Sequence, residues 1–61
     1  MGRMNPTPAE IRKARTDAGL SQVAAARLIH CSMRAWQEWE SGRNQMHPAF
    51  WELFLQKLES L

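Results

Sequence analysis

Four side chains with different hydrogen-bonding chemistry lie within one short stretch of the chain: Met33, Arg34, Gln37 and Glu38. A guanidinium can donate to guanine, an amide can pair with adenine, a carboxylate can accept from cytosine, and an apolar group can contact the thymine methyl. Because residues three and four apart share one face of a helix, we expect these groups to form a surface that could read base edges. The alternative is a polar helix face that only contacts solvent.

The sequence around these residues predicts two short helices joined by a tight turn. We expect the first from about Gln22 to Ile29 and the second from about Met33 to Ser41. Ser32 precedes the second helix, where its hydroxyl can cap free N–H groups, and Gly42 follows it, where a left-handed residue usually ends a helix. Residues 24–26 are alanines, which keep the first helix thin enough for a close crossing. This pattern is typical of a helix-turn-helix.

The same stretch resembles the DNA-binding domain of the lambda-repressor and Cro-like (XRE-type) family. The shared residues, within about Ile11 to Arg43, are Arg15, Gly19-Leu20-Ser21-Gln22, Ala26, Ser32, Trp39-Glu40 and Gly42. Two positions depart from the family: His30 replaces the usual turn glycine, and Trp36 replaces a small branched aliphatic residue. Histidine is among the residues that adopt positive φ more readily than most. Trp36 suggests a core repacked around a large ring. The resemblance implies a compact all-α fold of four or five helices that binds double-stranded DNA.

The resemblance also implies roles for individual residues. Arg15 would pair with Glu40 as part of the scaffold and would not read DNA; the alternative for Arg15 is an exposed cation. Free N–H groups at helix starts bind anions, and the loop after the second helix meets phosphate in this family. The residues expected to position the phosphate backbone are Ser21, Gln22, Ser32, Ser41, Arg43 and Asn44. Gln22 could instead be a solvated first-turn residue.

Two further helices complete the expected fold. Thr7-Pro8-Ala9-Glu10 has the pattern of a capping box and begins a helix that reaches about Ala18. Pro48 begins a last helix that reaches about Ser60. Its core-facing stripe would consist of Trp51, Phe54, Leu55 and Leu58.

Apolar side chains of the last helix exceed what one core-facing stripe can bury. The surplus residues are Phe50, Leu53 and Leu61. An exposed apolar patch usually marks a contact surface, so we expect these residues to form a homodimer interface. The alternative is a small domain that buries its last helix deeply.

Length and composition limit the possibilities further. Sixty-one residues allow one domain, which we place at residues 7–61 after a flexible N-terminus at residues 1–6. The net charge is +2 and the pI about 9.3. Residues 1–27 carry five basic and two acidic side chains, whereas residues 28–61 carry three basic and four acidic ones.

One cysteine and two histidines are too few for a closed zinc site, and a free thiol suits a reducing cytoplasm. No apolar run approaches a membrane span.

The leading prediction is a small transcriptional regulator of repressor type, from a phage or a bacterium. It would bind a two-fold operator as a homodimer, with its recognition helix in the major groove. The alternative is a protein-interaction module, such as an antitoxin-like partner that uses the same fold. An enzyme is not expected, because His30 and Cys31 are adjacent and would rarely face one substrate together. We expect no metal, cofactor, small-molecule ligand or membrane partner, and a location in the cytoplasm of a bacterium or phage-infected host.

Overall fold

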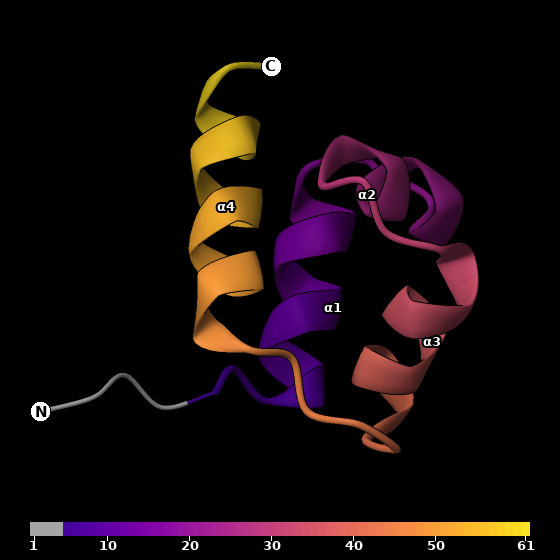
Figure 1. Ribbon diagram of the computed structural model, residues 1–61. Coiled ribbons are helices and arrows are strands. Elements are labelled where there is room, and N and C mark those ends of the chain that lie inside the picture. Colours follow the sequence, from indigo (N-terminus) through magenta and orange to yellow (C-terminus); the bar gives the residue numbers. More distant parts are fainter. Residues whose placement is uncertain (1–4) are drawn as a thin grey trace, which may run out of the picture.

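The computed structural model describes residues 5–61, and these form four α-helices and no strand. The helices are α1 (Pro8–Asp17), α2 (Gln22–Leu28), α3 (Met33–Ser41) and α4 (Pro48–Glu59). In the view of Figure 1, α4 is drawn on the left, α1 in the middle and the α2–α3 pair on the right, and α4 contacts α3 directly through Phe54 and Trp36. The predicted all-α, helix-turn-helix architecture is confirmed, with four helices in the described part of the chain. None of these four helices combines the length and apolar character needed to cross a membrane.

Local capping determines where the first three helices begin. The Thr7 hydroxyl accepts a hydrogen bond from the Glu10 N–H at 3.1 Å, and the Glu10 carboxylate accepts one from the Thr7 N–H at 2.8 Å. The hydroxyls of Ser21 and Ser32 each accept an N–H bond of 3.1 Å from the residue three positions ahead. Each such cap stabilises its helix by about 1 kcal/mol. Helix starts could therefore be read from the sequence.

The turn between α2 and α3 places a non-glycine residue in the left-handed region. His30 has φ of 60°, as expected from its position in place of the usual glycine. Gly42, which ends α3, has φ of 83°. A Cβ atom at Gly42 would lie 3.6 Å from the Pro8 side chain, so the start of α1 packs close to the end of α3.

Replacement of His30 by glycine should raise the free energy of unfolding by up to about 1.6 kcal/mol. The left-handed conformation costs an L-residue about 1–2 kcal/mol, and the greater freedom of glycine in the unfolded chain cancels about 0.4–1 kcal/mol of that gain. Urea denaturation of the variant measures the difference. His47→Gly is the control: His47 has an ordinary φ of −64° and its ring caps α4, so this variant should gain no stability and should lose the contribution of the cap. Destabilisation by His30→Gly would contradict the strain at this turn.

Trp36 lies at the centre of the hydrophobic core and is fully buried. Its ring meets Phe54 of α4 edge to face at a centroid distance of 4.8 Å, and Trp39 at 5.8 Å. The core cluster also contains Ile11, Ala25, Ala26, Ile29 and Met46. The large ring thus fills the centre of the core and joins α3 to α4.

The rotation of α4 differs from the expected one. Leu55, which we assigned to the core-facing stripe, is 38% exposed, whereas Leu53, which we counted as surplus, is half-buried and packs against the core. Leu53 and Leu55 lie about 100° to either side of the buried Phe54, so the burial of Phe54 alone does not choose between them. Phe50, one turn before Leu53, packs on the buried Trp39 ring at a centroid distance of 5.6 Å, which places the Leu53 side of α4 against the core.

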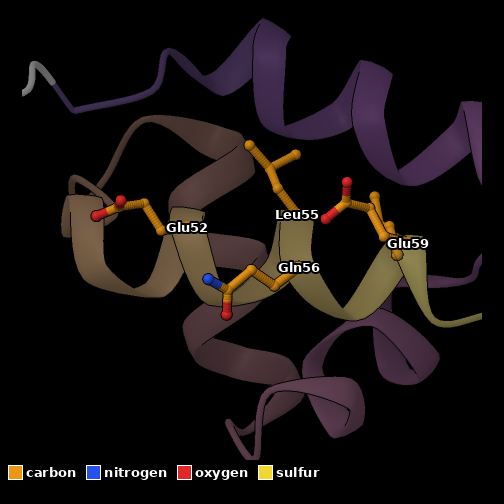
Figure 2. A pocket seen from close by; sticks show the side chains of 5 residues that line it. Glu52, Leu55, Gln56 and Glu59 are labelled. Atoms are coloured by element: carbon orange, nitrogen blue, oxygen red, sulfur yellow. The ribbon is translucent and has the colours of Figure 1, made fainter.

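The outer face of α4 is therefore mixed in character. Figure 2 shows Leu55 projecting from this face with Glu52, Gln56 and Glu59 around it. Phe50 and Leu61, the other two surplus residues, are 40% and 70% exposed.

The chain just before α1 is packed onto the domain. Residues 1–4 lie outside the described part, so the expected flexibility of that segment is not addressed for them. Asn5 and Pro6 differ from the expectation: Pro6 is buried, and the Asn5 amide donates a 2.9 Å hydrogen bond to the side-chain oxygen of Gln45. These two residues belong to the folded domain because they cover the loop between α3 and α4.

Candidate nucleic-acid interface

The outer face of α3 gathers the residues predicted to meet DNA. Met33 is 47% exposed, and Arg34 and Gln37 are exposed beside it. One open polar hollow is lined by Arg34, Gln37, Glu38, Ser41 and Arg43. The structure thus brings three predicted base-reading residues together with two predicted phosphate-positioning residues. The opposite face of α3 holds Trp36 and Trp39 in the core, which leaves this face free to approach a partner.

Glu38 is less accessible than its neighbours on this face. Its side chain is 26% exposed, compared with 86% for Arg34. One carboxylate oxygen accepts a 2.7 Å hydrogen bond from the Asn44 amide, and the other lies 3.6 Å from Nε of Arg34. Glu38 therefore joins a predicted base-reading residue to a predicted phosphate-positioning residue.

The predicted phosphate-positioning residues lie at the ends of α2 and α3. Ser21 and Ser32 cap the two helix starts and are exposed. The Ser41 hydroxyl donates to the Glu38 carbonyl at 3.0 Å and accepts from the Arg43 N–H at 3.3 Å, so it shapes the end of α3. Arg43 is exposed next to that end. Their contacts with phosphate remain predictions.

Arg15 and Glu40 lie together behind this face, as the resemblance implied. The Glu40 residue is only 5% exposed. Nε and Nη2 of Arg15 donate to its two carboxylate oxygens at 2.5 and 3.1 Å, while Nη1 donates to the Leu20 carbonyl at 2.9 Å. This bidentate pair connects α1 to α3 and fixes the α1–α2 turn, so its role is structural.

Three further donors near Glu40 were missed in the sequence. The Trp36 indole N–H donates to Glu40 at 2.5 Å, and the Gln22 amide donates at 3.2 Å. Nε of Arg12, whose side chain is exposed, lies 3.6 Å away on the solvent side. The spacing of four between Trp36 and Glu40 was the available signal, because it places both on one helix face.

Gln22 connects the buried carboxylate with the outer face of α3. Its amide nitrogen faces Glu40, and its amide oxygen accepts a 3.4 Å hydrogen bond from Gln37. A carboxylate only accepts hydrogen bonds, so this orientation of the amide is the one that its chemistry requires. Gln22 is half-buried and therefore has a structural role. The phosphate contact that we predicted for it remains a prediction.

The environment of Glu40 changes its acidity. Burial raises the pKa of its carboxyl, but the hydrogen bonds from Arg15, Trp36 and Gln22 lower the pKa by more, so that it lies below its ordinary value. A carboxyl with a depressed pKa in the folded state contributes stability above its unfolded pKa, about 4.3 for glutamate. That contribution is lost as the pH falls through the lower pKa of the folded state.

We therefore expect the unfolding free energy to decline as the pH falls below about 4.3, with Glu40 as a principal cause. Chemical denaturation at a series of pH values measures the decline. In Glu40→Gln the side chain cannot titrate, so the free energy of unfolding should be lower at neutral pH and should change less with acid. Equal acid dependence in both proteins would assign the effect to other carboxyls.

Other reactive groups in the described residues do not form a second site. Cys31 is half-buried, and burial raises the pKa of its thiol, so the thiol is mainly protonated near neutral pH. The His47 ring nitrogen Nδ1 accepts from the Ala49 N–H at 2.9 Å and caps α4. Within residues 5–61, no three His, Cys, Asp or Glu side chains gather in a way that could hold a metal ion.

A helix-turn-helix domain family matches residues 9–59 of this chain. The chain belongs to this helix-turn-helix family. The match extends from α1 to the end of α4, so it includes the capped helix pair and the outer face of α3. A helix-turn-helix domain with an exposed, polar second helix is a DNA-binding unit, and the resemblance seen in the sequence is confirmed at this level.

A curated relative of this helix-turn-helix domain is the type II methyltransferase M.MspI of Moraxella sp. The two sequences are 36% identical over 52 residues, which cover 85% of this chain and 12% of the methyltransferase. The chain therefore spans about an eighth of that relative, and the similarity concerns this domain alone.

Proposed function

We propose that this domain is a sequence-specific transcriptional regulator of repressor type, from a phage or a bacterium, which acts in the cytoplasm. The α3 helix would enter the major groove of duplex DNA. Met33, Arg34 and Gln37 would meet base edges at its exposed face, while Arg43 and the helix starts would meet phosphates. A free, half-buried thiol at Cys31 is compatible with a reducing compartment.

The observation that supports this proposal is the polar hollow on the outer face of α3. Two cations, Arg34 and Arg43, and one carboxylate, Glu38, line it. The cations can neutralise phosphate, and the guanidinium and amide groups can form the bidentate contacts that distinguish guanine and adenine. The hydrogen bonds that the buried Glu40 carboxylate accepts from Arg15 and Gln22 hold α3 against α1 and α2.

Selection from a pool of random duplexes, followed by titration of the selected duplex at two salt concentrations, tests the proposal. We expect a preferred sequence and an affinity that falls steeply as salt rises, because phosphate contacts release counterions. A shuffled duplex of the same composition is the control. Equal affinity for both duplexes, or no binding at low salt, would contradict a sequence-specific regulator. The second outcome would favour the alternative of a protein-interaction module.

We propose that the domain binds a two-fold operator as a homodimer through α4. Phe50 in the first turn of this helix and Leu61, two residues after its last residue, are exposed apolar residues, and one side of the Phe50 ring packs on Trp39. Leu53 is partly buried against the core of its own subunit. It would therefore contribute less to the dimer interface than we expected from the sequence. An isologous interface would use each of these residues twice.

Leu61→Glu should shift the protein from dimer to monomer, as measured by sedimentation at several concentrations. Burial of a leucine stabilises an interface by about 1.5–3 kcal/mol, and a two-fold interface loses that contribution twice. Leu55→Glu is the matched control, because Leu55 is exposed on the outer face of the same helix beside two carboxylates. A monomeric unaltered protein at high concentration would contradict the dimer.

We further propose that this chain acts by binding and does not catalyse a reaction. The Cys31 thiol is a poor nucleophile because burial raises its pKa. The matched relative is a methyltransferase, but the match covers 12% of that protein, and we do not extend its activity to this chain.

A further inference from the structure

Glu38 stands out because the sequence predicts that it reads a base, while the structure surrounds it with partners from its own chain. Its backbone carbonyl accepts N–H bonds from Arg43 at 3.0 Å and from Asn44 at 3.3 Å. Its carboxylate accepts the Asn44 amide at 2.7 Å and lies 3.6 Å from Arg34. Both the main chain and the side chain of Glu38 thus hold residues that are placed to contact DNA.

Accessibility separates Glu38 from the residues around it. Its side chain is 26% exposed and Arg34 is 86% exposed, so a duplex approaching α3 meets the guanidinium first. A cytosine amine could bind Glu38 only by sharing an oxygen with Asn44 or with Arg34. A carboxylate near phosphates is also repelled, and a neighbouring cation reduces that repulsion.

The chemistry of the two partners shows what Glu38 can do from this position. When Nε of Arg34 faces the carboxylate, the two terminal nitrogens remain available as a pair of donors, which matches O6 and N7 of guanine. When the Asn44 amide donates one hydrogen to Glu38, the second hydrogen remains available for a phosphate oxygen. The carboxylate therefore anchors Asn44 by a hydrogen bond and attracts Arg34 as an ion pair, without using the DNA-facing donors of either side chain.

We propose that Glu38 is a positioning residue, which orients Arg34 toward guanine and Asn44 toward phosphate and contacts no base itself. This inference rests on the proposed function and assigns the specificity of one base pair to an Arg34–Glu38 unit. Its negative charge also disfavours binding to unrelated duplexes, because nonspecific affinity depends on net positive charge.

The test compares Glu38→Gln with the unaltered protein on the selected duplex, on each of its single-base changes and on an unrelated duplex. Glutamine keeps an acceptor for Asn44, so the fold should remain intact, and thermal melting checks this. We expect affinity for the unrelated duplex to rise about two- to fivefold through the lost charge. Discrimination at the base pair read by Arg34 should fall by about tenfold. Glu59→Gln makes the same charge change at the far end of α4 and should leave discrimination unaltered.

Arg34→Ala, alone and combined with Glu38→Gln, identifies the route of the effect. If Glu38 acts through Arg34, Glu38→Gln changes no base preference in the Arg34→Ala background, and the two effects are not additive. A new base preference at a position that Arg34→Ala leaves unchanged would show that Glu38 reads a base, which overturns the inference. Discrimination equal to that of Glu59→Gln would also overturn it. Failure of the unaltered protein to bind any duplex would instead refute the proposed function, and with it this inference.

Discussion

The Glu40→Ala variant is expected to be largely unfolded at room temperature. Removal of one partner from a buried ion pair costs about 3–5 kcal/mol, because the remaining charge is stranded away from water. Here the loss also leaves the Trp36 indole N–H and the Gln22 amide without their acceptor. A domain of this size gains only about 3–5 kcal/mol from a single core, so the whole stability is at risk.

Chemical denaturation followed by circular dichroism measures this effect. Glu59→Ala is the matched control, since it removes an exposed carboxylate from the end of α4 and should change the unfolding free energy by less than about 0.5 kcal/mol. Glu40→Gln should be intermediate, because its amide oxygen can still accept one of the bonds. Unchanged stability in Glu40→Ala would mean that solvent reaches Arg15 and replaces the pair.

Arg34→Ala is expected to weaken binding to the preferred duplex by about 1–3 kcal/mol and to relax the preference at one base pair. Arg34 is the most promising reader because its side chain is 86% exposed and a bidentate arginine–guanine contact is the commonest specific contact. Titration of the variant against every single-base change of the preferred duplex measures both effects.

Arg43→Ala provides the contrasting control. It should weaken binding to all sequences alike and should reduce the salt dependence by about one phosphate contact per subunit. The half-sites of a dimer should lie about 34 Å apart, which is one helical turn. If Arg34→Ala lowered affinity uniformly while Arg43→Ala altered base preference, the two roles would have to be exchanged.

Features that depend on local chemistry could be predicted from the sequence. Thr7, Ser21 and Ser32 cap their helices through bonds to residues three positions ahead, so their effect requires no knowledge of the fold. Gly42 ends α3 in the left-handed region for an equally local reason. The helix boundaries agree to within about one residue because these signals are strong.

Features that depend on packing between helices could not be predicted in the same way. Hydrophobic spacing in α4 led us to place Leu55 in the core and Leu53 outside it, whereas Leu53 packs inward on the side where Phe50 meets Trp39. The Arg15–Glu40 pair came from the family resemblance, since 25 residues separate its members. The bond from Gln22 to the same carboxylate depends on how α2 crosses α3, which periodicity does not specify.

The hydrogen bond from Asn44 to Glu38 lies between the features set by local chemistry and those set by packing between helices. The residues are six apart and joined by the turn at Gly42, so the sequence permits the contact without requiring it. Predictions from helix position alone placed Glu38 among the base readers. Asn44, in the loop after α3, is a partner of Glu38 that the position of Glu38 in the helix does not indicate.

The Glu40 carboxylate has a consequence for how the domain assembles. Its donors come from α1, α2 and α3 at once, through Arg15, Gln22 and Trp36. A partly assembled chain with only two of these helices docked would bury a charge or an amide without its partners, at a cost that no local helix propensity offsets. We therefore expect the three helices to assemble together in an all-or-none transition.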